Sequence, residues 1–254
     1  MLQALVITLR EGIEAFLIVA ISLAYLRKVG RHQLVSAVHT GVFAGLLTSL
    51  VVGMLLFNAS NQEVLDGPLA LVAAASVAWM VVHMWRAGRQ MRGDIEGRLS
   101  ASSRREGRGA FLGVLAFTIL MISREGMETA LLLFQLHETP HLLAGAAIGC
   151  LGAVALAWAW SAYGHRVNLA LFFQVTALFL FVFVLQLLVR GVHEMSEQGM
   201  LPWSTLLHER TEAWGPDSTV GHTLTYLLVL LPAGWLLVRS ALQRGPGLAS
   251  RSGS

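Results

Sequence analysis

The chain has 254 residues, of which 55% are hydrophobic and only 13% are charged, and its mean hydropathy is +0.64. A soluble domain carries about 25% charged residues, so this composition excludes an ordinary soluble protein and predicts an integral membrane protein. The pI near 9.6 would suit a nucleic-acid partner, but the arginines fall between apolar segments, so membrane topology explains them better and we expect no nucleic-acid partner.

Seven apolar segments are long enough to cross a bilayer as helices. They run over about 2–26, 35–57, 67–85, 110–136, 141–163, 168–190 and 222–239. The sequence therefore predicts an all-α integral membrane protein, with seven transmembrane helices in a single transmembrane domain over 1–254. Charges interrupt the first segment and no basic stretch precedes it, so we expect a retained helix rather than a cleaved signal peptide.

Basic residues between the segments indicate the orientation of the chain. Arg27, Lys28 and Arg31 follow the first segment, and seven arginines lie within the loop 86–109, whereas the loops on the other side carry few basic residues. Basic loops stay in the cytoplasm, so we expect the N-terminus outside, the C-terminus inside and the chain in the cytoplasmic (inner) membrane. The loop 86–109 is expected to set topology and to rest on anionic lipid, and the acidic loop 191–221 is expected outside.

Two copies of a charged motif show that the sequence repeats itself. Residues 10–14 read Arg-Glu-Gly-Ile-Glu and residues 124–128 read Arg-Glu-Gly-Met-Glu, in the first and fourth segments. The segments that follow carry glycines four apart, which permit close helix approach: Gly41 and Gly45, then Gly145 and Gly149. We predict two three-helix repeats, about 1–90 and 110–190, of opposite orientation, plus a last helix; inverted repeats recur among transporters.

The residue spacing places the charges of each motif on one face of a helix. The glutamates are three apart, and each arginine precedes the second glutamate by four, which permits an intrahelical ion pair. A charge at the bilayer centre costs about 2.5 kcal/mol or more, so a function is expected. Inversion should bring the charges together inside the bundle: Glu11, Glu14, Glu125 and Glu128 with Arg10 and Arg124. Carboxylates suit iron, manganese, magnesium or calcium; the alternative is a static knot of buried ion pairs.

The paired motifs in the first and fourth of seven segments resemble the ferroxidase-coupled iron permease family, the oxidase-dependent iron transporters that include bacterial Efe-type permease subunits. The resemblance implies a non-enzymatic permease with Fe2+ or Fe3+ as substrate, no permanently bound cofactor, and an extracytoplasmic oxidase or iron-binding protein as partner. It implies that the four glutamates bind the ion and that both arginines are needed beside them. Ile13 and Met127 stand where the family mostly has leucine.

Several residues are candidates for an outer entrance site. His193, Glu194 and Glu197 follow the sixth segment and form one cluster if that helix continues for a turn; the alternative is a solvated acidic helix end. Glu138 and Asp66, in two other outer loops, are further candidates, although polar loop residues are common.

Two other functions remain open on the sequence. One is a transporter of another divalent metal, such as lead or manganese, because carboxylates alone select weakly. The other is an intramembrane enzyme that uses paired glutamates as acid and base. The oligomeric state is also open, a homo-oligomer included.

Overall fold

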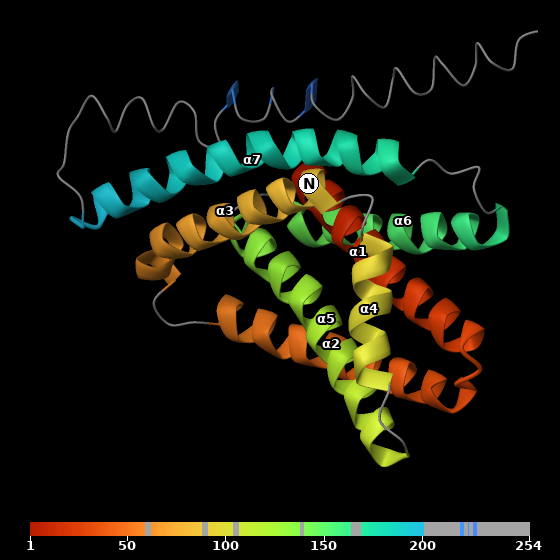
Figure 1. Cartoon of the computed structure of the whole chain (residues 1–254). Helices are drawn as coiled ribbons and strands as arrows, with labels where there is room; N and C mark the ends of the chain where they lie inside the picture. Colours follow the sequence, from red (N-terminus) through yellow and green to blue (C-terminus); the bar gives the residue numbers. More distant parts are fainter. Residues whose placement is uncertain are drawn as a thin grey trace, which may run out of the picture.

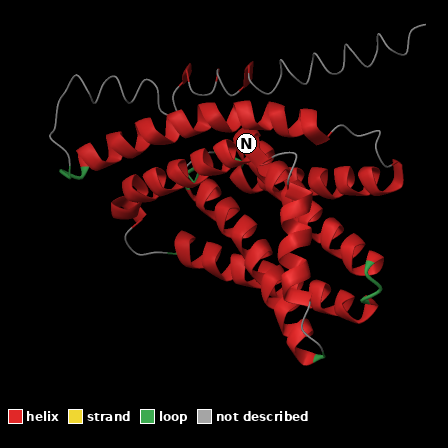
Figure 2. Cartoon of the chain, in the orientation of Figure 1, coloured by secondary structure: helices red, strands yellow, loops and turns green. Residues whose placement is uncertain are grey.

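The structure is a computed structural model that describes residues 1–58, 62–87, 91–103, 107–137, 140–163 and 169–200, together with 219, 220, 223, 226 and 227. Within these residues the chain forms seven α-helices and one short 3-10 helix and contains no strand (Figures 1 and 2). The helices are α1 Leu2–Lys28, α2 Val35–Phe57, α3 Gln62–Ala87, α4 Met91–Ser103, α5 Arg108–Phe134, α6 Leu142–Tyr163 and α7 Leu169–Glu197, with η1 at His32–Leu34. The predicted all-α fold is confirmed.

Six of the predicted segments correspond to helices, namely α1, α2, α3, α5, α6 and α7. The start of α3 and the end of α7 differ from the prediction. Helix α3 begins at Gln62 and runs through Pro68, as membrane helices can where neighbours satisfy the freed backbone group. Helix α7 continues to Glu197, so the extra turn needed for the outer cluster is present. The predicted last helix, 222–239, lies outside the described residues apart from 223, 226 and 227.

Four helical stretches are long and apolar enough to cross a membrane: His32–Phe57, Arg108–Phe134, Leu142–Trp160 and Thr176–Glu197. Helix α1 has a similar length, but Arg10, Glu11 and Glu14 interrupt its apolar character. The apolar part of α3, Asp66–Val82, is shorter. Large apolar side chains are exposed along α2, among them Phe43, Leu46, Leu47 and Leu50. An apolar surface of this extent suits lipid rather than water, which indicates a multi-pass membrane protein.

Helix α4 is an element that the sequence did not predict, within the loop 86–109. It lies against α1 and α5, with Ile95 and Leu99, one turn apart, buried in a cluster with Leu26 and Val114. Arg31, just after α1, donates a hydrogen bond to the Ser103 carbonyl oxygen at the end of α4. The few apolar residues of α4 give only a weak amphipathic pattern. Its many charged residues are typical of a loop, so the sequence did not predict the helix.

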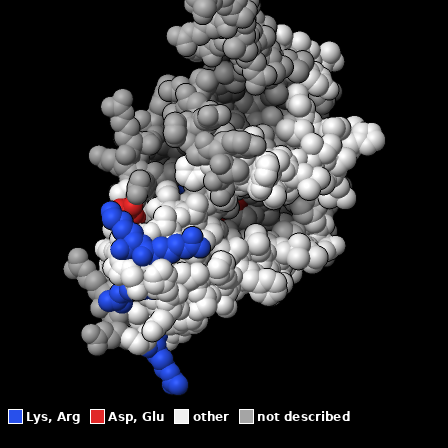
Figure 3. Space-filling model, turned by 90° about the vertical axis from the view of Figure 1, so that its right-hand side faces the viewer, with Lys and Arg blue, Asp and Glu red and all other residues white. Residues whose placement is uncertain are grey.

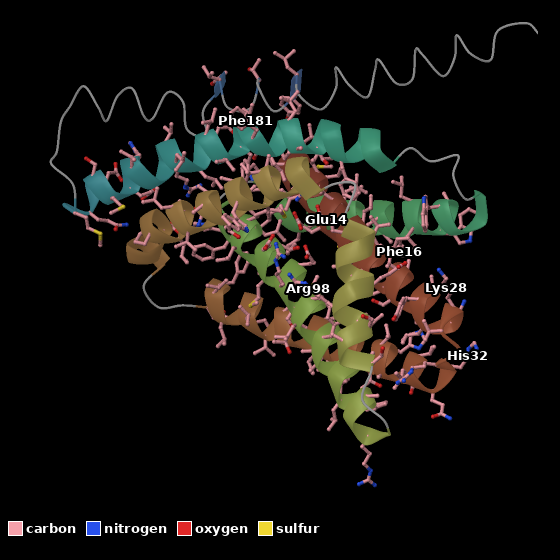
Figure 4. All side chains as sticks on the ribbon, viewed as in Figure 1. Glu14, Phe16, Lys28, His32, Arg98 and Phe181 are labelled. Carbon is pink, nitrogen blue, oxygen red and sulfur yellow. The ribbon has the colours of Figure 1, made fainter. Side chains whose placement is uncertain are left out.

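Basic residues at the end of α1 and on α4 are exposed on the surface. Arg27, Lys28 and Arg98 are exposed, and in Figure 3 the blue side chains lie at the left and lower edge of the face shown. Figure 4 shows Lys28 and His32 at the far end of α1 and the following turn, well away from Glu14. This distribution separates the charges of the loops from those of the two motifs.

Helix pairs form between the predicted repeats rather than only within them. Helix α1 packs against α6, α2 against α5, and α3 against α7, while α1 and α5 also contact each other (Figure 1). The glycine pairs lie at the first two interfaces. A Cβ at Gly45 would lie 2.9 Å from the Ile122 Cβ, and one at Gly149 would lie 2.5 Å from the Leu5 carbonyl oxygen. This reciprocal packing is what two related three-helix units would give; their orientation in a membrane stays a prediction.

Apolar clusters flank the charged motif of α1 at both ends. Toward the N-terminus, Ile7 packs in a cluster with residues of α3, α5 and α7 such as Val77 and Phe183. Toward the C-terminus, Ile18 packs in a second cluster with residues of α2, α4 and α5 such as Phe117. The motif residues between them are therefore held inside the bundle, and Figure 4 shows Glu14 in its interior.

Candidate metal-binding site

In the first motif, both glutamates contact the arginine. Arg10 is completely buried, and its Nη1 donates a hydrogen bond to Glu11 Oε1 at 2.7 Å. Its Nη2 lies 2.6 Å from Glu14 Oε1, across one helical turn. Both carboxylates are buried as well. The guanidinium therefore holds one oxygen of each glutamate, as its planar fork of donors allows.

The second motif is more open. Arg124 Nε donates to Glu128 Oε1 at 3.0 Å, again across one turn, but the Arg124 side chain is 49% exposed. Glu125 and Glu128 are nonetheless buried. The intrahelical ion pair permitted by the spacing is thus present in both helices, with one arginine enclosed and the other at the surface.

Three carboxylates from the two helices come together. Glu11, Glu14 and Glu125 each offer an oxygen within 4.8 Å of the others, which we call the carboxylate trio. Glu128 lies outside the trio and is paired with Arg124. Buried Oε2 atoms of Glu11, Glu125 and Glu128 accept no hydrogen bond from the part of the chain that the structure describes. Such atoms are costly unless a partner satisfies them, and these oxygens could serve as metal ligands.

The glycines inside the motifs explain how the glutamates face each other. A Cβ at Gly12 would lie 2.7 Å from the Ala153 Cβ of α6, and one at Gly126 would collide with the Ser49 side chain of α2. The glycine side of each motif is therefore pressed against a neighbouring helix. The carboxylates emerge elsewhere on the helix, where α1 and α5 meet.

Met80 of α3 is a neighbour of the site that the sequence analysis missed. Its Sδ lies 3.6 Å from Arg10 Nη1, and its side chain is buried in the cluster that contains Ile7. A methionine in an apolar helix is typical of a packed core, so no signal in the sequence distinguishes it. Met127 of the second motif is 38% exposed.

A second group of polar residues lies where α3, α5 and α7 approach one another. Asp66 is buried, and its Oδ2 lies 4.0 Å from His137 Nε2. A Cβ at Gly67 would lie 3.2 Å from the Glu194 Cβ, so the start of α3 is close to the end of α7. The structure thus places Asp66 near both Glu194 and His137, and the entrance role of this region stays a prediction. Glu138 lies outside the described residues.

Arg190 joins the same region and was not among the candidates. It is buried, donates from Nη1 to the Gln135 carbonyl oxygen at 2.7 Å, and has its Nε 3.9 Å from Glu194 Oε1. In a sequence, an arginine at the edge of a span indicates membrane topology, so the contacts of Arg190 with Gln135 and Glu194 were not predicted. His193 Nε2 lies 3.6 Å from Glu197 Oε1, a more exposed pair on the same helix.

Comparisons with known proteins find several relatives of the chain. An uncharacterized protein of Archaeoglobus fulgidus is 30% identical over 205 residues, covering 78% of this chain and 71% of its own. Proteins named ferrous iron permease EfeU are each 29% identical: over 203 residues in Yersinia pestis, covering 76% and 72% of the two chains, and over 206 residues in Escherichia coli O6:K15:H31, covering 76% and 73%. No solved structure matches the chain. Residues 1–228 match the Iron permease FTR1 family, and the chain belongs to that family.

Proposed function

We propose that the chain carries iron across the cytoplasmic membrane through the cluster of Glu11, Glu14, Glu125 and Glu128. The observation that carries the proposal is the carboxylate trio, in which two helices bring three buried carboxylates within 4.8 Å. Membership of an iron permease family supports iron as the ion, as do the relatives named ferrous iron permease. Both findings favour a transporter over an enzyme.

A bound cation would resolve two unfavourable features of the trio. A buried acceptor without a hydrogen bond costs about 1–3 kcal/mol, and three carboxylates at this distance repel one another. Arg10 compensates one of these charges and contacts Oε1 of Glu11 and Oε1 of Glu14. An iron ion takes oxygen ligands of this kind. A static knot of ion pairs would leave the extra carboxylate of Glu125 without a purpose.

The proposal includes the route and the partners of the ion. Iron would arrive from an extracytoplasmic oxidase or iron-binding protein and meet Asp66, Glu194 and the His193–Glu197 pair at the outer side, with Glu138 as a further candidate. It would then pass the four glutamates near the middle of a seven-span bundle and leave on the side of the basic loops. An N-terminus outside, a C-terminus inside and a possible homo-oligomer belong to the same proposal.

Uptake into liposomes tests the proposed function. The purified protein should accumulate Fe2+ under anaerobic conditions, and Glu125→Gln should abolish accumulation because the trio loses a charge and a ligand. Glu96→Gln, the same chemical change on α4 away from the cluster, is the matched control and should transport normally. Preference for lead or manganese over iron would favour the other transporter, and absence of any flux in the wild type would contradict a permease.

Thiol labelling tests the orientation. Cys150 is the only cysteine, so a Cys150→Ser background accepts single cysteines at two exposed positions, Arg98 on α4 and Met200 after α7. In whole cells a membrane-impermeant maleimide should label Met200→Cys, and it should label Arg98→Cys only after permeabilisation. The reverse pattern would overturn the orientation.

A further inference from the structure

Arg10 occupies a position from which it controls the charge of the carboxylate trio. It is completely buried, in contact with Glu11 on one side and Glu14 on the other, with the Met80 sulfur against the same guanidinium nitrogen that binds Glu11. A side chain enclosed on these sides has little room to leave when an ion enters. Arg10 should therefore stay in place in the loaded site.

Two buried oxygens of the trio accept no hydrogen bond from Arg10. Arg10 contacts Oε1 of Glu11 and Oε1 of Glu14, whereas the buried Oε2 atoms of Glu11 and Glu125 accept no hydrogen bond from any described residue. An ion bound by these oxygens would leave the contacts of the guanidinium in place. The site is thus able to hold both cations at once.

The charge of this arrangement decides which ion fits it. Carboxylates that bind a metal are ionised, so the trio with Arg10 carries a net charge of −2. The Arg124–Glu128 pair adds no net charge. In a buried site an uncompensated charge is costly. A divalent ion neutralises the cluster, and a trivalent ion leaves one positive charge.

We propose that Arg10 is a specificity-determining residue that matches the carboxylate trio to a divalent rather than a trivalent cation. This inference rests on the proposed function, because it assumes that the trio binds the transported ion. It assigns different tasks to the two arginines of the repeated motif: Arg10 sets the charge that the ion meets, and Arg124 positions Glu128.

Equilibrium binding to the purified full-length protein tests the inference. The probes are Fe2+ under anaerobic conditions and Ga3+, a redox-inert trivalent ion, both buffered with citrate. Arg10→Gln leaves a net charge of −3 and should lower the ratio of Fe2+ to Ga3+ affinity by about tenfold or more, the order expected for one buried charge near the ion. Arg10→Lys keeps the charge and should keep the ratio, even if both ions bind more weakly.

A compensating variant separates charge from damage to the fold. Arg10→Gln combined with Glu128→Gln restores a total charge of −2 over the four glutamates and two arginines. It keeps all three carboxylates of the trio, because Glu128 lies outside it, and should move the ratio back toward that of the wild type. Arg124→Gln, which removes a half-exposed charge, should change the ratio less than Arg10→Gln. An unchanged ratio in Arg10→Gln, or a double variant that behaves like Arg10→Gln alone, overturns the inference.

The same measurements keep the inference distinct from the proposed function. If wild-type protein binds neither ion, or if Glu125→Gln binds as wild type does, the trio is not the ion site and both ideas fail. If Glu125→Gln loses binding but Arg10→Gln keeps the wild-type ratio, the site stands and only the role of Arg10 is wrong.

Discussion

Arg10 and Arg124 hold the same position in two copies of one motif, yet the structure surrounds them differently. Arg10 is completely buried between two glutamates, whereas Arg124 pairs with one glutamate and is 49% exposed. The motif itself supplies identical chemistry to α1 and α5. The difference comes from neighbouring helices, since α3 places Met80 against Arg10. A sequence repeat can thus give two inequivalent halves of one site.

The largest expected effect is the loss of iron uptake in Glu14→Ala and in Glu128→Ala, although both proteins should still insert. The comparison predicts different reasons for the two losses. Glu14 belongs to the trio, so its variant should also lose Fe2+ binding at equilibrium. Glu128 lies outside the trio, so its variant should bind Fe2+ but not move it. Liposome uptake and equilibrium binding, measured side by side, check this; full transport by both variants would remove the four-glutamate site.

Glycine substitutions at the α2–α5 and α1–α6 interfaces should lower the stability of the protein equally. Gly45→Ala and Gly149→Ala each force a Cβ into an occupied place, and overpacking of this kind costs about 1–3 kcal/mol. Thermal unfolding in detergent should show a lower Tm for both variants. Gly53→Ala is the matched control, because its Cβ would lie 3.6 Å from the Ala130 Cβ, an ordinary contact. A large effect at only one of the two positions would contradict equivalent interfaces.

Conservative replacement of the arginines should have a smaller and unequal effect. Arg10→Lys keeps the charge but loses the planar fork that reaches Glu11 and Glu14 together. Fe2+ uptake should fall about tenfold, which corresponds to about 1.4 kcal/mol. Arg124→Lys replaces a half-exposed side chain with one carboxylate contact and should lose less. Equal rates in wild type and Arg10→Lys would show that charge alone matters in the first motif.

The smallest effect is expected at the outer end. Glu194→Gln with Glu197→Gln should raise the half-saturating iron concentration about threefold, because charges that solvent still reaches in part, 24% and 46% exposed here, contribute about 1 kcal/mol. The maximum rate should stay near that of the wild type, in contrast to the glutamates of the motifs. Uptake over a range of iron concentrations provides the measurement. A double variant that fails at every concentration would place this region in the translocation path.

The sequence predicted the features that follow from repeated motifs and apolar segments. Apolar runs predicted six of the helices described, and the spacing of the motifs predicted both intrahelical ion pairs. The unequal surroundings of the arginines could not be predicted, because Met80 looks like any core methionine and its contact depends on tertiary packing. Helix α4 was missed because two buried residues, Ile95 and Leu99, are too few to mark an amphipathic helix among arginines. Arg190 was missed because its partner is a backbone carbonyl, which sequence does not reveal.

The glycine contacts also have a mechanical consequence. With Cβ positions at Gly12 and Gly41 only 2.7 Å and 2.6 Å from side-chain atoms of the facing helices, α1 with α6 and α2 with α5 are too closely joined to slide or separate cheaply. Each pair should therefore move as one stiff unit. The seam between the units is the contact of α1 with α5, where the carboxylates lie. A small rotation of one unit against the other would change the surroundings of the carboxylate trio without disturbing either pair.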